Sequence, residues 1–119
     1  MNERQSDTTL GIIKIHKEAI ASIASLAALE TEGVSRLIKK FDFDIFKFLS
    51  KKPESAIKVY IYKNQEIVLD VPLLVKYGYN IPEVAYRVQD NIQLALEKMT
   101  NMQVKQINII VKGVERSQV

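Results

Sequence analysis

The sequence predicts an α+β fold, a two-layer sandwich in which a mixed sheet carries both helices on one face, with the elements in the order β-α-β-β-α-β. Helices are indicated by apolar residues three and four positions apart at 16–29 and 81–100. Strands are indicated by alternation of apolar and polar residues at 56–62, 67–71 and 104–112. Because each helix has a single apolar stripe, both helices must lie on the same face of the sheet. The 119 residues are enough for one domain.

The chain is expected to begin with a tail, a strand and a helix. Residues 1–9 are polar and lack periodicity, so we expect a disordered N-terminal tail. Residues 10–15 (LGIIKI) are rich in β-branched side chains and predict the first strand. The helix over 16–29 follows from apolar residues at helical spacing, namely Ala19, Ile20, Ile23, Ala24 and Ala27. Gly33 is expected to end it, because glycine readily adopts the left-handed conformation that follows many helices.

The middle of the chain predicts a β-hairpin. Residues 34–40 fit either a short strand or a turn, and their pattern does not separate the two. Residues 56–76 alternate on both sides of a turn at 63–65, where Asn64 tolerates a left-handed backbone. Pro72 cannot donate a hydrogen bond to a neighbouring strand, which indicates a sheet edge or a bulge at that position.

A second helix and a last strand complete the predicted fold. Gly78 interrupts the preceding strand, and Asn80 can cap the free amides of the first helical turn. That turn contains two residues that favour helix starts, Pro82 and Glu83. Gly113 is expected to close the strand over 104–112. The last residues, 115–119, should fray.

The composition excludes several classes of site. The chain has no Cys, which excludes disulfides, thiolate zinc sites and cysteine nucleophiles. A single His, His16, leaves little room for a multi-histidine site, and we expect no metal and no cofactor. The acidic pairs Asp42/Asp44 and Glu30/Glu32 are expected to be solvated charges. The net charge of +3 is weak evidence for nucleic-acid binding. Since no apolar run approaches the ~20 residues of a membrane span, we expect a cytoplasmic protein.

A set of turn, cap and core residues in a fixed order resembles a known family. Its most specific stretch runs from Tyr77 to Ala85 (YGYNIPEVA). The residues that stand out along the chain are Gly11, Gly33, Tyr77, Gly78, Asn80, Ile81, Pro82, Glu83 and Gly113. Together they resemble the alkaline-shock-protein family of bacterial envelope stress response proteins, over a single domain at 10–114. None of them forms a catalytic signature.

The resemblance implies a cytoplasmic, non-enzymatic structural or adaptor protein. Family members resemble self-associating scaffolds, some of them held at the membrane by a partner that carries its own membrane segment. Others are linked to envelope stress or to the control of fatty-acid synthesis. We therefore expect a homo-oligomer with a partner near the membrane. The chain departs from the family between Gly33 and Ala56, where Gly-rich sequence is more usual and this chain has Phe and Lys.

The first candidate surface is the Phe/Lys-rich insert at 35–55. Aromatic and basic side chains alternate there with two acids, and the candidate docking residues are Phe41, Phe43, Ile45, Phe46, Phe48, Lys39, Lys40 and Lys47. Such a segment suits an acidic membrane interface or a groove on a partner protein. The alternative is a local apolar cluster that covers one end of the sheet, and the pattern fits a helix or a strand.

The second candidate surface is the face of the sheet turned away from the helices. If the alternation is read with Val59 inward, the outward side chains include Tyr60, Tyr62, Val68 and Ile110. An exposed apolar patch of this kind indicates an association surface, so self-association is expected there. With Lys58 beside the tyrosines, a platform for single-stranded nucleic acid is the alternative. Salt dependence separates the two, because phosphate contacts weaken steeply with added salt.

Overall fold

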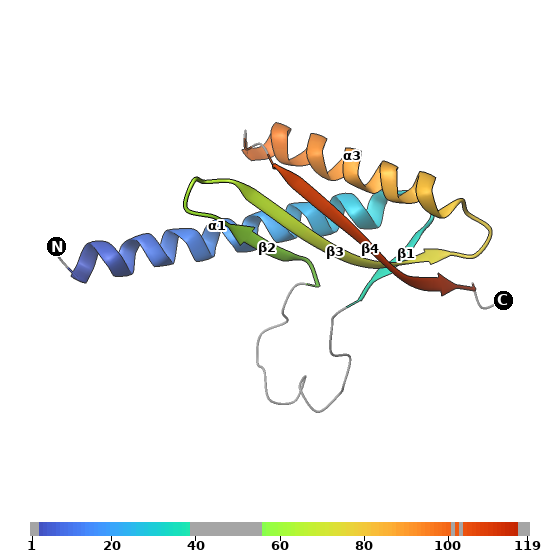
Figure 1. Cartoon of the computed structure of the whole chain (residues 1–119), viewed down its shortest axis with the longest axis horizontal. Coiled ribbons are helices and arrows are strands. Elements are labelled where there is room, and N and C mark those ends of the chain that lie inside the picture. Colours follow the sequence, from blue (N-terminus) through green and yellow to red (C-terminus); the bar gives the residue numbers. More distant parts are fainter. Residues whose placement is uncertain (1–2, 39–55, 101, 103, 117–119) are drawn as a thin grey trace, which may run out of the picture.

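The computed structural model describes residues 3–38, 56–100, 102 and 104–116, which form two layers (Figure 1). The elements along the chain are α1 (Glu3–Glu30), β1 (Val34–Leu37), β2 (Lys58–Ile61), β3 (Ile67–Lys76), α3 (Ile81–Thr100) and β4 (Gln106–Glu115). Helices α1 and α3 contact each other, and both pack against one face of the four-stranded sheet. The predicted α+β sandwich with both helices on one face is confirmed.

Strand β3 is the centre of a mixed sheet. β4 runs parallel to it along one edge, from the pair Val68–Gln106 onward. β2 and β1 run antiparallel to β3, and they pair with its opposite ends, Ile67 to Asp70 and Leu73 to Val75. A strand has two edges, so β2 and β1 share the second edge end to end.

The prediction of a first strand at 10–15 is wrong, because α1 runs without a break from Glu3 to Glu30. The helix also includes residues 3–9, which were expected to be a disordered tail. Ile12 and Ile15 suggested a strand through their β-branches, but their spacing of three, followed by four to Ala19, is also helical. Helix propagation costs little once a helix has started, so spacing prevails over local propensity.

The described elements therefore follow the order α-β-β-β-α-β. Residues 34–37, which fitted either a strand or a turn, form strand β1. The N-terminal part of α1 extends past the other elements of the fold (Figure 1).

The core lies between the helices and β3. Alternate side chains of β3 are buried on the helix side, namely Ile67, Leu69, Val71, Leu73 and Val75. They meet a buried stripe on α3, which consists of Val84, Val88, Ile92 and Leu96. The apolar pattern predicted a longer stripe that also included Ala85, Ala95 and Met99, but Met99 is 71% exposed. α1 contributes mostly small side chains to the same core, among them Ile20, Ala24, Ala27 and Ala28. Small side chains let the backbone of α1 approach the sheet closely.

The predicted hairpin is confirmed as β2–β3, with one change in its turn. Gln65 takes the positive φ of 67°. Asn64 instead accepts a hydrogen bond on its Oδ1 from the Glu66 amide at 3.2 Å, which stabilises the turn in another way.

Pro72 does not lie on an edge strand, because β3 is the central strand. Its carbonyl accepts a bond from the Ile38 amide at 3.1 Å, so its nitrogen also faces the edge that β2 and β1 share. Pro72 stands after the last β2 partner, Asp70, and before the first β1 partner, Leu73. The missing N–H therefore falls in the gap between two short strands. The β3–β4 register shifts at the adjacent Leu73/Leu74 step.

The last strand extends further than predicted. β4 continues to Glu115, and Gly113 lies inside it, paired with Leu74 just after the register shift. A glycine at a shifted register is typical of a β-bulge, which bends the strand and does not end it.

Candidate interaction surface

The face of the sheet turned away from the helices is the surface that the sequence singled out. Its residues form cross-strand rows: Tyr60, Val68 and Gln106 in one, Lys58, Asp70 and Asn108 in the next, and Pro72 with Ile110 in the third. We call this surface the open face and define it by Lys58, Tyr60, Val68, Asp70, Pro72, Asn108, Ile110 and Lys112. Neither α1 nor α3 covers it.

Apolar groups of the open face are accessible. Tyr60 is 40% exposed and lies opposite Val68, and Ile110 is 38% exposed and lies opposite Pro72. Tyr60, Pro72 and Ile110 line a shallow hollow of about 240 Å³. Tyr62 follows the end of β2 and, with Val68, lines a neighbouring depression. The structure thus brings the four predicted residues of this surface to one side of the sheet.

A polar row crosses the middle of the open face. The Asn108 amide donates from Nδ2 to Oδ1 of Asp70 at 2.9 Å, and Gln106 donates from Nε2 to Oδ1 of Asn108 at 2.7 Å. Lys58 stands opposite Asp70 on β2. The side chains of Gln106, Asn108 and Asp70 bond to one another within the sheet, so these hydrogen bonds need no ligand. The polar row separates two apolar areas of the open face. Sequence reasoning missed Asp70 and Asn108, although the alternation that found Val68 and Ile110 also places them outward.

An ion pair lies at each end of the sheet. At one end Lys105 Nζ lies 2.8 Å from Glu66 Oε2. The Lys105 bond lowers the pKa of the Glu66 carboxyl below its usual value. At the other end the Ser35 hydroxyl donates to Glu115 Oε1 at 2.6 Å, and Arg36 Nε lies 3.1 Å from Oε2. The Ser35 bond, assisted by Arg36, lowers the pKa of Glu115.

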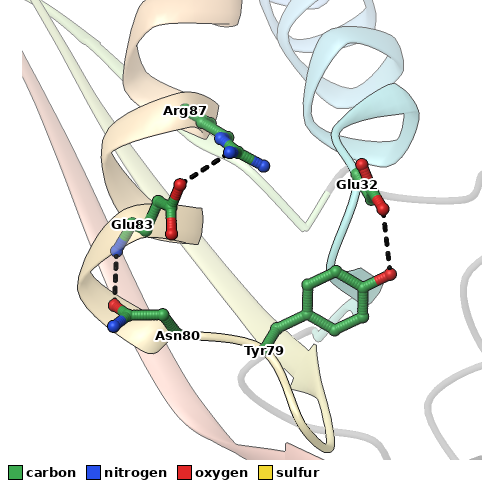
Figure 2. Close-up of polar contacts among 5 residues, drawn as sticks. All are labelled: Glu32, Tyr79, Asn80, Glu83 and Arg87. Atoms are coloured by element: carbon green, nitrogen blue, oxygen red, sulfur yellow. Dashed lines mark hydrogen bonds and ion pairs between the residues drawn. The ribbon is translucent and has the colours of Figure 1, made fainter.

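The stretch YGYNIPEVA forms the turn between β3 and α3 (Figure 2). Gly78 has a φ of +94°, a conformation that favours glycine. The side-chain oxygen of Asn80 accepts a bond from the Glu83 amide at 3.1 Å, so Asn80 is the predicted cap of α3. Glu83 also forms an ion pair with Arg87 one turn later, with Oε1 and Nη2 2.6 Å apart. This part of the motif starts a helix.

The same stretch holds the end of α1 against the start of α3. The Tyr79 hydroxyl donates to Glu32 Oε1 at 3.2 Å, which raises the pKa of Tyr79 (Figure 2). Gly33 has a φ of +97°, and a Cβ there would lie 2.7 Å from Val84 Cγ2 and 2.9 Å from Tyr79 Cδ1. Its carbonyl also accepts a bond from the Lys76 amide at 2.7 Å. The motif is thus built for close packing between the two helix ends.

A second link between the helices was not visible in the sequence. Thr31 is buried, its hydroxyl donates to the Ala27 carbonyl at 2.9 Å, and it accepts a bond from Asn91 Nδ2 at 2.8 Å. Thr31 and Asn91 are 60 residues apart, so no local pattern connects them.

The remaining predicted residues lie elsewhere. The docking set at 39–48 falls outside the described residues, as do Asp42 and Asp44. His16 is exposed on α1, and Gly11 lies within that helix. In the described part of the chain, no group of three or more His, Cys, Asp or Glu could hold a metal ion. No helix in that part is long and apolar enough to cross a membrane.

Comparison with known proteins gives a family for this chain. YqhY of Bacillus subtilis (strain 168) is 34% identical over 110 residues, which are 92% of this chain and 81% of YqhY. YloU of the same organism is 29% identical over 109 residues, 90% of this chain and 91% of YloU. A solved structure of MamM-CTD superimposes with a TM-score of 0.48 and 16% identity, over 85% of this chain and 98% of that chain. A family model described as the alkaline shock protein 23 family, with a cell envelope-related function, matches residues 5–116. The chain therefore belongs to the alkaline shock protein 23 family.

Proposed function

We propose that this protein is a non-enzymatic structural or adaptor protein of the envelope stress response, which acts by self-association and by docking to a partner. The observation that carries the proposal is the open face: one side of the sheet is packed by helices, while the other presents Tyr60 and Ile110 to solvent. The cell envelope-related function of the family supports the place of action.

The chemistry of the open face favours contact between proteins over catalysis. Its polar side chains Asp70 and Asn108 bond to each other, so they are already satisfied within the sheet. The areas on either side, around Tyr60 and Ile110, are apolar and shallow. Exposed apolar area of this kind gains free energy when a second surface excludes water from it. A second copy would bring the same patch, and self-complementary patches build two-fold dimers.

Docking to a partner is the second part of the proposal. The Phe/Lys-rich segment, with Phe41 and Phe48 among its aromatic residues and Lys39 and Lys47 among its basic ones, has the composition of a partner-binding or membrane-facing surface. A partner that carries its own membrane segment would hold the protein at the cytoplasmic side of the envelope.

A nucleic-acid platform is the second candidate, because Lys58 and Lys112 line the same hollow as Tyr60. Bases stack on exposed aromatic rings, and flanking lysines bind the phosphates. Asp70 also lines that hollow and would repel a phosphate backbone. Its place in the centre of the open face therefore favours protein association.

Light scattering behind size exclusion, over a range of protein and salt concentrations, tests the proposal. We expect the measured mass of the wild type to exceed the 13.6 kDa of the monomer, and the assembly to persist in high salt. The double variant Tyr60→Thr/Ile110→Thr keeps residues that suit strands and should run smaller. Tyr86→Gln is the matched control, because Tyr86 is an exposed tyrosine on α3, 69% accessible.

Equal masses for the wild type and the open-face variant would contradict self-association through this surface. Single-stranded nucleic acid that binds the wild type at low salt, and is lost in Lys58→Ala/Lys112→Ala, would instead support the second candidate.

A further inference from the structure

Helix α1 carries a second stripe of apolar and small residues on the side opposite the core. Ala19, Ser22, Leu26 and Leu29 are all exposed, Leu26 by 59% and Leu29 by 53%. We call these four exposed residues the outer stripe. At about 100° per residue they lie roughly opposite the buried stripe that packs on the sheet, which consists of Ile20, Ala24, Ala27, Ala28 and Thr31.

The spacing of the outer stripe is that of a two-helix seam. Its positions are separated by three, four and three residues, the a/d repeat of coiled coils. Two further apolar residues, Ile12 and Ile15, stand at the next positions of the same repeat towards the N-terminus. The N-terminal end of α1 extends past the sheet and α3 (Figure 1). A short helical segment without a packing partner is only marginally stable, so a second helix along this seam would stabilise it.

We propose that the outer stripe of α1 is an interface with the outer stripe of a second copy of this chain, with the two helices antiparallel. This surface is separate from the open face, which lies on the other side of the sheet, and the proposal does not rest on the function proposed above.

The antiparallel pairing has one register that places every position of the repeat from 12 to 29 beside another. Position 15 then lies beside Leu26 of the second copy, and position 12 beside Leu29, which pairs isoleucine with leucine at both ends. Ala19 packs beside Ser22 in the two central layers, where small side chains allow the helices to approach closely. A serine hydroxyl in such a contact can bond to a backbone carbonyl of its own helix, so it needs no partner across the seam.

The registers shifted by one heptad place fewer apolar positions beside each other. A shift by one heptad towards the N-terminus places Leu26 and Leu29 beside the polar Thr8 and Gln5. The opposite shift places position 15 beside Gly33, which follows the end of α1 at Glu30. Shape therefore favours the central register, because it places each leucine beside an isoleucine position, whereas the opposite shift places Leu29 and Leu26 beside the smaller Ala19 and Ser22.

Charge supports the same register. The positions that flank an antiparallel seam bring Glu18 beside Ser25 of the second copy, and His16 beside Ile23, so no two like charges meet. In the register shifted towards the N-terminus, Glu18 would face Glu18 of the second copy, and in the opposite shift it would face Glu32. Both contacts are repulsive. The central register therefore combines apolar contacts along the seam with the absence of like-charge contacts beside it.

Covalent trapping tests this interface, because one helix pair is small beside the ~800 Å² per partner of a standard interface. The chain has no Cys, so an introduced cysteine is the only thiol of its variant, and any disulfide must involve it. We expect a mixture of Ala19→Cys and a tagged Ser22→Cys to form a disulfide-linked heterodimer under mild oxidation faster than either variant alone. The cysteine pair must bring its Cα atoms within about 7 Å, which random collisions of a stable fold rarely maintain.

Two controls make the test decisive. Leu94→Cys, on the exposed side of α3, measures collisional cross-linking at a comparably accessible position, 48% exposed. Adding Leu26→Lys/Leu29→Lys to each cysteine variant should abolish the heterodimer, while circular dichroism stays unchanged. Lysine is a good helix former and suits the negative end of the helix dipole, so these changes do not weaken α1 itself.

The outcomes separate cleanly. A heterodimer that forms no faster than the Leu94→Cys control, or that survives the lysine substitutions, would overturn the interface. Rapid cross-linking of Ala19→Cys with itself would overturn the antiparallel register, because only parallel helices bring equal positions together there. Persistence of the heterodimer in the Tyr60→Thr/Ile110→Thr background is expected, and its loss there would overturn the separation of this interface from the open face.

Discussion

Replacing Gly33 by Ala should destabilise this fold more than any other single-methyl insertion at its described glycines. Gly33 has a φ of +97°, and an added Cβ would lie 2.7 Å from Val84 Cγ2, a buried atom of α3. The left-handed backbone costs an L-residue about 1–2 kcal/mol. Inserting a methyl group into a well-packed region costs about 1–3 kcal/mol more. We therefore expect Gly33→Ala to lower the free energy of unfolding by about 2–5 kcal/mol.

Gly78 supplies the matched control. Its φ of +94° is nearly the same, but a Cβ there would meet no atom within 4 Å. Gly78→Ala should therefore cost only the backbone part, about 1–2 kcal/mol. The difference between the two variants isolates the contact of the two helix ends from the strain of the backbone.

The assay is urea unfolding followed by circular dichroism, at one low protein concentration because self-association adds apparent stability. A Gly33→Ala/Val84→Ala double variant extends it. Removal of Val84 Cγ2 relieves the closer of the two clashes and leaves the one with Tyr79, so the double variant should be more stable than the sum of the single losses predicts. A Gly33→Ala variant no less stable than Gly78→Ala, or strict additivity in the double variant, would refute this reasoning.

Three further predictions follow from single contacts. Asn80→Ala should lower the free energy of unfolding by about 1 kcal/mol through loss of the α3 cap, while Asn80→Asp retains it; urea unfolding of both distinguishes capping from side-chain size. Thr31→Val and Asn91→Ala should be less destabilising together than their sum, by about 1 kcal/mol, since each breaks the same hydrogen bond; additivity would show that the bond contributes nothing. Ser35→Ala should raise the pKa of Glu115, measured by NMR titration, because the Ser35 hydroxyl donates to the carboxylate. The stability that this lowered pKa contributes is present above the ordinary glutamate pKa of 4.5 and is lost as the pH falls through the folded-state value; an unchanged titration curve would exclude the Ser35 contact as its cause.

Local signals predicted the second half of the fold well. The cap at Asn80 and the four-residue apolar stripe on α3 depend on contacts within one or two turns of helix, which the sequence records directly. The β2–β3 hairpin is also local, because a short turn joins two strands that pair in the register of their alternation.

The N-terminal prediction failed where two local signals disagreed. The isoleucines near residue 12 have the branched side chains of a strand and the spacing of a helix, and the chain follows the spacing. The same spacing continues into the outer stripe of α1. This helix therefore carries two stripes where a single one was predicted, and Ala19, predicted to share a face with the buried Ile20, is exposed.

Sequence periodicity is enough to assign which side chains share a face. Alternation placed Tyr60, Val68 and Ile110 on one side of the strands, and helical spacing placed Val84 with Val88, because these periods follow from backbone geometry alone. What those faces pack against depends on contacts between distant parts of the chain. Three features involve residues far apart in the chain. They are the order of strands around β3, the gap between β2 and β1 at Pro72, and the Thr31–Asn91 hydrogen bond. Such contacts form because distant apolar faces are buried against each other as the helices pack on one side of the sheet, and no local pattern encodes which distant segment lies opposite.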